Sequence, residues 1–283
     1  MMNNPIQFID AHFHPHNSRA CHLFIHLDPD SYSYAIVDKE QNCLSVLFKK
    51  YFPQSTETFS AFNRLEILRA ENENVNLDFG KVKISVETKA FTFIPEELYS
   101  PADLHQYSKF IGIEPAAVLL NSDIRPLGIK AISAVAPDLE NSLKKSFIDP
   151  LIVSQANPFI AGIYQLQGQG SQSEFFLNFN HDSFEAAVIR KGNLEFYNIF
   201  EISNTDEFNY YILNLVNQLE LDRSLPVTLS GEIDRENERY LRLQKYFEQL
   251  SFAEASLLTN GPDVDKPFAP HRVFSLLSLD LCE

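Results

Sequence analysis

Two stretches of the chain, related by an offset of 152 residues (176 − 24), are the strongest indication of its fold. Residues 24–39 have the sequence FIHLDPDSYSYAIVDK, and residues 176–191 have the sequence FLNFNHDSFEAAVIRK. Identical residues are Phe24 and Phe176, Asp30 and Asp182, Ser31 and Ser183, Ala35 and Ala187, and Lys39 and Lys191. A repeat of this length indicates two copies of one supersecondary unit.

The patterns that follow each copy support this interpretation. Alternating apolar residues predict strands over residues 23–27, 32–37 and 43–48, and again over 175–179, 184–189 and 194–200. Apolar residues at helical spacing then predict a helix after each set, with Phe59, Phe62, Leu65 and Leu68 in the first and Phe208, Ile212, Leu215 and Leu219 in the second. Because the whole order recurs, we favour a real duplication over a chance likeness between two aromatic-rich hairpins.

The remaining segments complete an α/β pattern. We expect extended chain over residues 81–94, strands over 116–120, 129–136 and 226–230, and helices over 101–111, 137–147 and around 240–250. The run 274–281 alternates in the manner of a strand. The candidate helix caps are Ser55 or Thr56, the pair Asn204 and Glu207, and Asp234.

Composition limits the classes of function. The chain has 283 residues, enough for one large domain or two ordinary ones, and its formal charge is 23 − 38 = −15. This acidic balance argues against a nucleic-acid partner, because it repels phosphate backbones. Cys21, Cys43 and Cys282 form no C-x-x-C pair, as is typical of reduced cytosolic thiols. Without a signal peptide pattern or a long apolar run, we expect a cytoplasmic protein with no membrane span.

The duplicated unit resembles the actin-like ATPase fold of actin, Hsp70 and sugar kinases. Residues 227–247, VTLSGEIDRENERYLRLQKYF, resemble the adenosine motif of the bacterial actin homologues PilM and FtsA. Three stretches are similar to the uncharacterised bacterial domain-of-unknown-function family 3822: CHLFIHLDPDSYSYAI at 21–36, VKISVETKAFTFIPEELY at 82–99 and PHRVFSLLSLDLCE at 270–283.

The resemblance implies a duplicated actin-like ATPase (ribonuclease H-like) α/β fold. Lobe I would span residues 1–150 and lobe II residues 151–283, with a hinge near 150–172. Each lobe would hold a mixed sheet that opens with an antiparallel three-strand meander.

The resemblance also implies a nucleotide site in a cleft between the lobes. The predicted contacts lie in the turns 28–31 and 180–183 and at the end of the strand 226–230; they are Asp28, Asp30, Ser31, Asp182, Ser183 and Gly231. Active members of the fold need glycines that let the backbone approach the phosphates, and an acidic residue for Mg²⁺.

This sequence departs from that pattern at both turns. Pro29 or Asp30 stands where the first turn needs glycine, and Asn178 or Asn180 replaces the acidic residue of the second. Glu232 stands where a second adenosine-motif glycine is expected. An alternative interpretation is that the Asp and Ser residues are turn formers and that Gly231 is a turn glycine.

These departures favour a non-catalytic interaction or assembly scaffold, with an unidentified protein partner and with neither catalytic residues, a resident metal nor a cofactor. One alternative is an actin-like ATPase that binds ATP and Mg²⁺ through divergent loops. A second is a metal-dependent amidohydrolase that uses the His-x-His pair of His12 and His14, flanked by Asp10 and His16. No sequence feature selects an oligomeric state.

Overall fold

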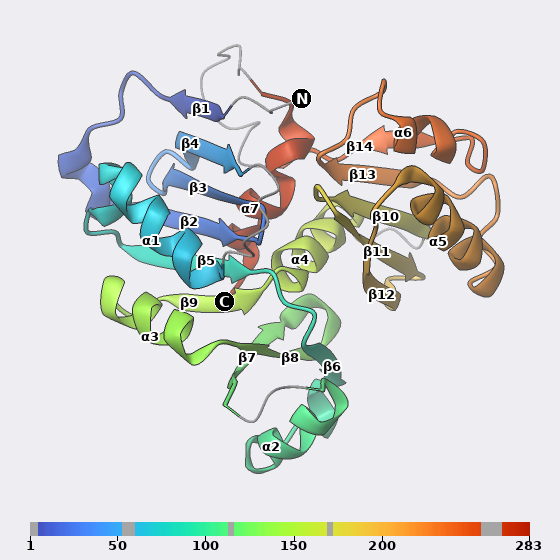
Figure 1. The fold of residues 1–283 in the computed structure, drawn as a ribbon, viewed down its shortest axis with the longest axis horizontal. Helices are drawn as coiled ribbons and strands as arrows, with labels where there is room; N and C mark the ends of the chain where they lie inside the picture. Colours follow the sequence, from blue (N-terminus) through green and yellow to red (C-terminus); the bar gives the residue numbers. More distant parts are fainter. Residues whose placement is uncertain (1–4, 53–59, 113–115, 169–171, 256–267) are drawn as a thin grey trace. The chain divides into compact units, whose positions relative to one another are not determined.

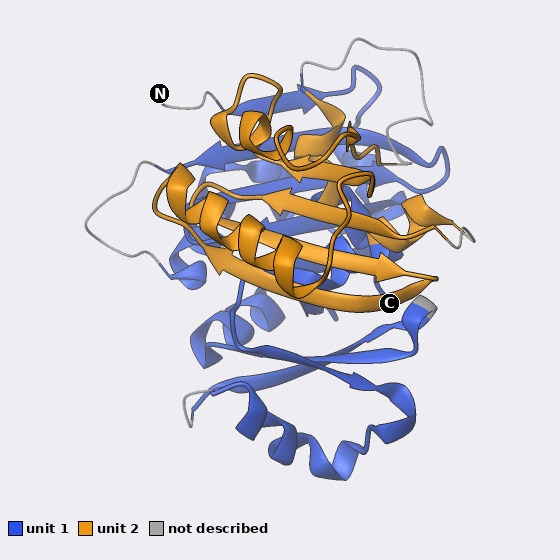
Figure 2. Ribbon diagram, turned by 90° about the vertical axis from the view of Figure 1, so that its right-hand side faces the viewer, with its two compact units in different colours: residues 1–161, 256–268, 276–283 blue, residues 162–255, 269–275 orange. Residues whose placement is uncertain are grey.

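A computed structural model describes residues 5–52, 60–112, 116–168, 172–255 and 268–283 (Figure 1). The chain divides into two compact units (Figure 2). Unit 1 consists of residues 1–161, 256–268 and 276–283, and unit 2 of residues 162–255 and 269–275.

Both units are built on the same five-strand arrangement, which confirms the predicted duplicated fold. In unit 1 the strand order is β4-β3-β2-β5-β9, and β1 (Ile6–Ile9) adds to the outer edge of β4. In unit 2 the order is β12-β11-β10-β13-β14. In each unit the first three strands of this order are antiparallel. The last two run parallel to the third, which is β2 in unit 1 and β10 in unit 2. The strands of unit 1 are β2 (Cys21–Leu27), β3 (Ser31–Asp38), β4 (Cys43–Tyr51), β5 (Lys81–Val86) and β9 (Leu151–Ser154). Those of unit 2 are β10 (Glu174–Phe179), β11 (Ser183–Arg190), β12 (Asn193–Glu201), β13 (Val227–Gly231) and β14 (Leu250–Phe252).

A shared irregularity shows how closely the two copies match. The register between the second and third strands shifts between Ile36 and Val37 in unit 1 and between Val188 and Ile189 in unit 2. These positions keep the offset of 152 residues (188 − 36). The third strands begin at Cys43 and Asn193, an offset of 150 (193 − 43), because the connecting turn of unit 2 is two residues shorter.

Helices cover one face of each sheet because their apolar positions recur at helical spacing. In unit 1, α1 (Ala61–Glu71) and α3 (Pro137–Ser146) place Leu65, Leu68, Leu139 and Leu143 in the core beneath β2 and β3. In unit 2, α5 (Thr205–Gln218) and α6 (Glu238–Leu243) do the same with Phe208, Ile212, Leu215, Tyr240 and Leu243. The helix α4 (Ala156–Gln167) follows β9 and was not predicted.

A third, smaller sheet is inserted in unit 1 between β5 and α3. Its strand order is β6-β8-β7, with β6 (Phe91–Pro95), β7 (Val118–Ile124) and β8 (Ile129–Val135) all antiparallel (Figure 1). The predicted helix over residues 101–111 is a series of short helical turns around α2 (Leu104–Tyr107).

Three local predictions are corrected. Residues 274–281 form α7 (Phe274–Ser278) and a 3₁₀ turn rather than a strand, because leucine favours helix and short apolar runs do not separate the two periods. Asn237, not Asp234, caps α6, since the helix begins only at Glu238. Ser60 caps α1, and the proposed caps Ser55 and Thr56 lie outside the described residues.

The predicted lobes and the observed units differ in extent. Because β9 pairs with β5, residues 151–154 belong to the sheet of unit 1, and residues 276–283 join the same unit. The division into lobe I (residues 1–150) and lobe II (residues 151–283) stays a prediction. Within the described residues, no helix combines the length and apolarity needed to cross a bilayer.

Candidate functional site

The first predicted turn is closed by its own side chains. The Asp28 carboxylate is buried, and its Oδ1 accepts hydrogen bonds from the backbone N–H groups of Asp30 (2.8 Å) and Ser31 (2.5 Å). Its Oδ2 accepts a third from the Ser31 hydroxyl at 2.5 Å. A carboxylate in this arrangement organises a turn in the manner of an Asx motif. The acidic group that would meet Mg²⁺ is thus already bonded to the turn that holds it.

An arginine fixes the tip of the same turn. Arg64, on α1, donates from Nε (3.0 Å) and Nη2 (2.5 Å) to the carbonyl oxygen of Pro29. Its guanidinium group stacks on the Phe52 ring, 3.7 Å from the ring centre. Charged donors make stronger hydrogen bonds than neutral ones, so this contact holds the tip firmly.

The second turn has an equivalent clamp from a different helix. Arg239, on α6, donates to the carbonyl oxygens of Asn180 (3.2 Å) and His181 (2.9 Å). His181 is the counterpart of Pro29, 152 residues later (181 − 29). Asp182 contacts His181 Nδ1 at 2.5 Å, and Ser183 closes the turn by accepting from the Asn180 N–H at 3.0 Å. Both turns are therefore held through their carbonyl groups.

Gly231 is required by the packing of two strands. Its φ is +80°, a left-handed conformation that favours glycine. A Cβ atom there would lie 2.1 Å from the Phe179 carbonyl oxygen and 2.7 Å from its nitrogen. The next residue, Glu232, donates its N–H to that same oxygen at 2.7 Å. The close approach that Gly231 permits in the structure is that of β13 to β10.

A buried polar row that sequence analysis did not identify crosses four strands of unit 2. The Tyr197 hydroxyl donates to Glu185 Oε1 at 2.5 Å, and Asn178 Nδ2 donates to Glu185 Oε2 at 2.6 Å. Ser230 Oγ then donates to Asn178 Oδ1 at 2.8 Å. The only signal in the sequence is a glutamate within the otherwise apolar strand FEAAVI. Burial raises the pKa of Glu185 to about 7, against the lowering effect of its two hydrogen-bond donors.

Unit 1 carries a counterpart at the same register. His26, the equivalent of Asn178, lies opposite Ser85, and His26 Nδ1 is 2.7 Å from Ser85 Oγ. His26 Nε2 is 3.7 Å from Asp28 Oδ2, beyond hydrogen-bond range. Burial lowers the pKa of His26, although the nearby Asp28 raises it.

These three residue types do not form a hydrolytic triad. Ser85 is 0% exposed on the interior strand β5, so its hydroxyl offers no surface to a substrate. A working triad also needs the carboxylate within hydrogen-bond reach of the imidazole. The cluster of Asp28, His26 and Ser85 is a buried polar contact between strands.

The N-terminal histidines lie on the surface. The His12 side chain is 89% exposed and contacts Asp10, while the rings of His14 and His16 stack at 5.4 Å. In the part of the chain that the structure describes, no set of three potential metal ligands includes any of these histidines. The two large sheets are open and mixed and the small sheet is antiparallel, whereas the amidohydrolase alternative requires a closed parallel barrel.

The raised pKa of Glu185 predicts that the stability of the protein depends on pH. The folded-state pKa of about 7 lies above the ordinary value of 4.5, so the folded state holds this proton more tightly. The resulting stabilisation is complete below pH 4.5 and is lost as pH rises through 7, a change of about 3 kcal/mol in the free energy of unfolding. Glu185→Gln should remove this loss. In urea titrations, the free energy of unfolding of the variant should therefore rise relative to that of the natural protein between pH 5 and pH 8. Equal pH dependence in Glu185→Gln and in the exposed control Glu236→Gln would contradict the assignment.

Comparison with known proteins places the chain in a family. Residues 10–250 match the model described as "Protein of unknown function (DUF3822)". The chain belongs to the DUF3822 family. No curated protein matches the sequence.

Solved structures show which fold this DUF3822 member has. A Bacteroides thetaiotaomicron protein, described as having an actin-like ATPase fold and unknown function, matches with a TM-score of 0.79 at 19% identity, over 96% of this chain and 99% of that one. The PilM–PilN type IV pilus biogenesis complex matches with a TM-score of 0.63 at 11% identity, over 92% of this chain and 96% of that one. The DUF3822 protein therefore has the actin-like ATPase fold, as the resemblance of its duplicated unit implied.

Proposed function

We propose that this DUF3822 protein is a non-catalytic actin-like scaffold that binds another protein. The observation that carries the proposal is the Asp28 carboxylate, whose two oxygens are taken up by three hydrogen bonds within its own turn. A nucleotide-bound Mg²⁺ would have to compete with these bonds for the same oxygens. Neither turn offers a glycine, so side chains stand where a phosphate would approach the backbone.

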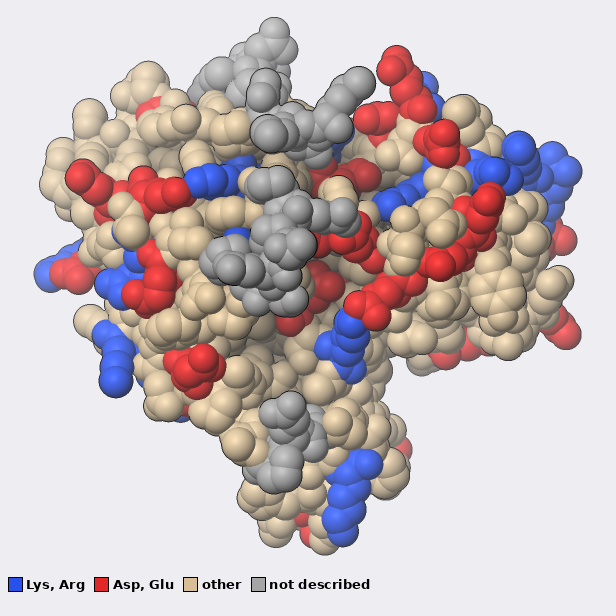
Figure 3. Space-filling view, in the orientation of Figure 1, with Lys and Arg blue, Asp and Glu red and all other residues tan. Residues whose placement is uncertain are grey.

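The similarity to PilM supports the interaction part of the proposal. That structure is described as a complex of PilM with PilN, so one protein of this fold assembles with another protein. The net charge of −15 and the acidic side chains spread over the face in Figure 3 fit a protein partner better than a nucleic acid.

A titration with ATP and Mg²⁺ tests the proposal. Calorimetry and thermal unfolding of the full chain should show no saturable heat and no rise in melting temperature. A nucleotide bound at 100 times its dissociation constant would stabilise the protein by about 2.7 kcal/mol, which such a measurement resolves easily.

The contrary result would identify the ATPase alternative. Saturable ATP binding that disappears in Asp28→Ala would assign Asp28, Asp30, Ser31, Asp182, Ser183 and Gly231 the nucleotide contacts that the resemblance implies. On the proposal, Asp28→Ala instead lowers the free energy of unfolding by about 2 kcal/mol, since it removes the turn's three hydrogen bonds, and changes no ligand response.

A further inference from the structure

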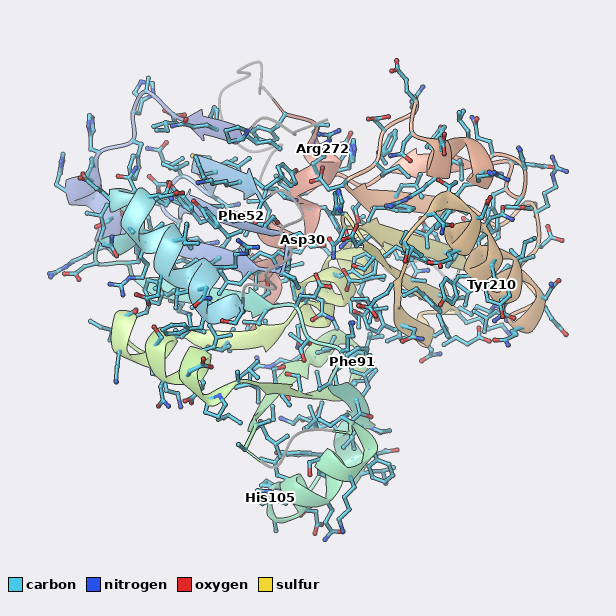
Figure 4. All side chains as sticks on the ribbon, viewed as in Figure 1. Asp30, Phe52, Phe91, His105, Tyr210 and Arg272 are labelled. Atoms are coloured by element: carbon cyan, nitrogen blue, oxygen red, sulfur yellow. The ribbon has the colours of Figure 1, made fainter. Side chains whose placement is uncertain are left out.

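The small sheet of unit 1 carries a groove that includes neither the two hairpin turns nor the polar row of unit 2. A half-open cavity of about 570 Å³ lies between the helical segment 104–109 and the start of β7, within the size range of ligand sites. Its lining residues are Leu104, His105, Ser108, Lys109, Gly112, Ala117, Val118 and Leu119. Figure 4 shows His105 on α2, at the end of the small sheet.

One wall of this groove is an edge strand. In the sheet order β6-β8-β7, the only strand that pairs with β7 among the described residues is β8. The Ala134 N–H on β8 donates to Ala90 O, on the side of β6. Because backbone groups alternate in direction along an antiparallel ladder, Leu119, opposite Ala134, directs its N–H and C=O away from β8. A second extended chain can bond to these groups.

The first residues of this edge also lack several of the features that block such pairing. Natural edge strands are protected by charges, prolines or bulges, and residues 118–121 of β7 have none of these. Val118, Leu119 and Leu120 are half-buried. Nearby, Phe110 is 79% exposed and Leu98 67% exposed, and the lower part of the surface in Figure 3 is mostly uncharged.

The polar side chains of the groove indicate which charge a bound chain would carry. Lys109 and His105 are exposed on the helical wall, and no acidic side chain is among the described residues that line the cavity. An acidic group on a bound chain would therefore find a complementary charge at Lys109. The groove combines a cavity lined by both apolar and polar side chains, an open backbone edge and a cation.

The geometry points to a docking site for an extended peptide segment of a protein partner. The segment adds a strand to the edge of β7 through Leu119, places an apolar side chain in the cavity and sets a neighbouring Asp or Glu beside Lys109. Main-chain bonds supply affinity in this mode and the pocket supplies selectivity. The inference rests on the proposed scaffold function and names the chemistry of its partner.

Short random peptides displayed on phage and selected on the full-length protein provide the probe. We expect the selected peptides to share an apolar residue next to Asp or Glu. Fluorescence polarisation should show that Lys109→Glu weakens a selected peptide at least about tenfold, the effect of one lost charge contact. Lys145, on α3, is also exposed, and Lys145→Glu should leave the affinity unchanged.

Methylation of backbone nitrogens in the peptide tests the strand pairing itself. Methyl groups on the nitrogens that face β7 should abolish binding, while methyl groups on the alternate nitrogens should not. Binding that survives both Lys109→Glu and methylation of the nitrogens that face β7 would overturn the site. A selection that enriches no peptide would overturn it too. A selected peptide that matches a segment of this chain would overturn the partner and assign the groove to a second copy. The ATP titration is independent of all these outcomes, so failure of the groove and failure of the proposed function are distinguishable.

Discussion

Gly231→Ala should destabilise unit 2 by about 4 kcal/mol, among the largest effects of any single substitution in this chain. Two costs add at this position. The left-handed φ of +80° disfavours any residue with a Cβ, and that Cβ would lie 2.1 Å from the Phe179 carbonyl oxygen, closer than van der Waals contact allows. Relief requires β13 to move away from β10, which breaks the Glu232 bond to Phe179. Urea unfolding, followed by circular dichroism, measures the loss.

Gly192 provides the matched control for this experiment. Its φ is +78°, nearly that of Gly231, but an added Cβ would meet no atom within 4 Å. Gly192→Ala should therefore cost only the conformational part, about 1 kcal/mol. Equal losses in the two variants would show that Phe179 does not press on Gly231, and would restore a ligand as the reason for the glycine. If Gly231→Ala does not accumulate as folded protein while Gly192→Ala does, that result also indicates that Phe179 packs closely against Gly231.

The duplicated hairpins could be predicted because their information is local. Alternation of apolar residues and the Asp-Ser turns fix strand length and direction, so β2, β3, β10 and β11 fall within one or two residues of their predicted bounds. The parallel pairing of β5 with β2 could not be predicted this way. It joins segments about 59 residues apart (81 − 22), and no local pattern encodes that register.

The candidate site shows the same limit. That Asp28 forms turn bonds could be foreseen, since aspartate prefers such positions. That Arg64 and Arg239 clamp the two turns could not, because each arginine comes from a helix far along the chain from the carbonyl groups it meets. Glu185 was missed for a related reason. Its partners Asn178 and Tyr197 lie on two other strands, and Ser230, which bonds to Asn178, lies on a third, so only the folded sheet aligns them.

The C-terminal segment was predicted as a strand, and its actual role makes the second large prediction. Lys83, buried on β5, donates from Nζ to the carbonyl oxygens of Asp280 and Cys282, both at 2.7 Å. Lys39 Nζ holds the Asp280 carboxylate at 2.9 and 3.0 Å. Burial lowers the pKa of Lys83, although the Asp280 carboxylate raises it. The buried Lys83 ammonium group thus holds the C-terminal segment against the sheet of unit 1. Leu279 and Cys282 of this segment are also buried.

Lys83→Met should lower the free energy of unfolding by about 3 kcal/mol, because it leaves the half-buried carbonyl group of Asp280 and the buried one of Cys282 without their donor. Lys39→Met should cost under about 1 kcal/mol, since that ion pair is partly exposed. Lys81→Met, at an exposed position on the same strand, should be nearly neutral. Urea unfolding ranks the three variants, and carboxypeptidase digestion should trim the last residues of Lys83→Met much faster than those of the natural protein. If Lys83→Met and Lys81→Met lose equal stability and resist trimming alike, the C-terminal segment is held by its leucines alone and the buried lysine contributes nothing to its docking.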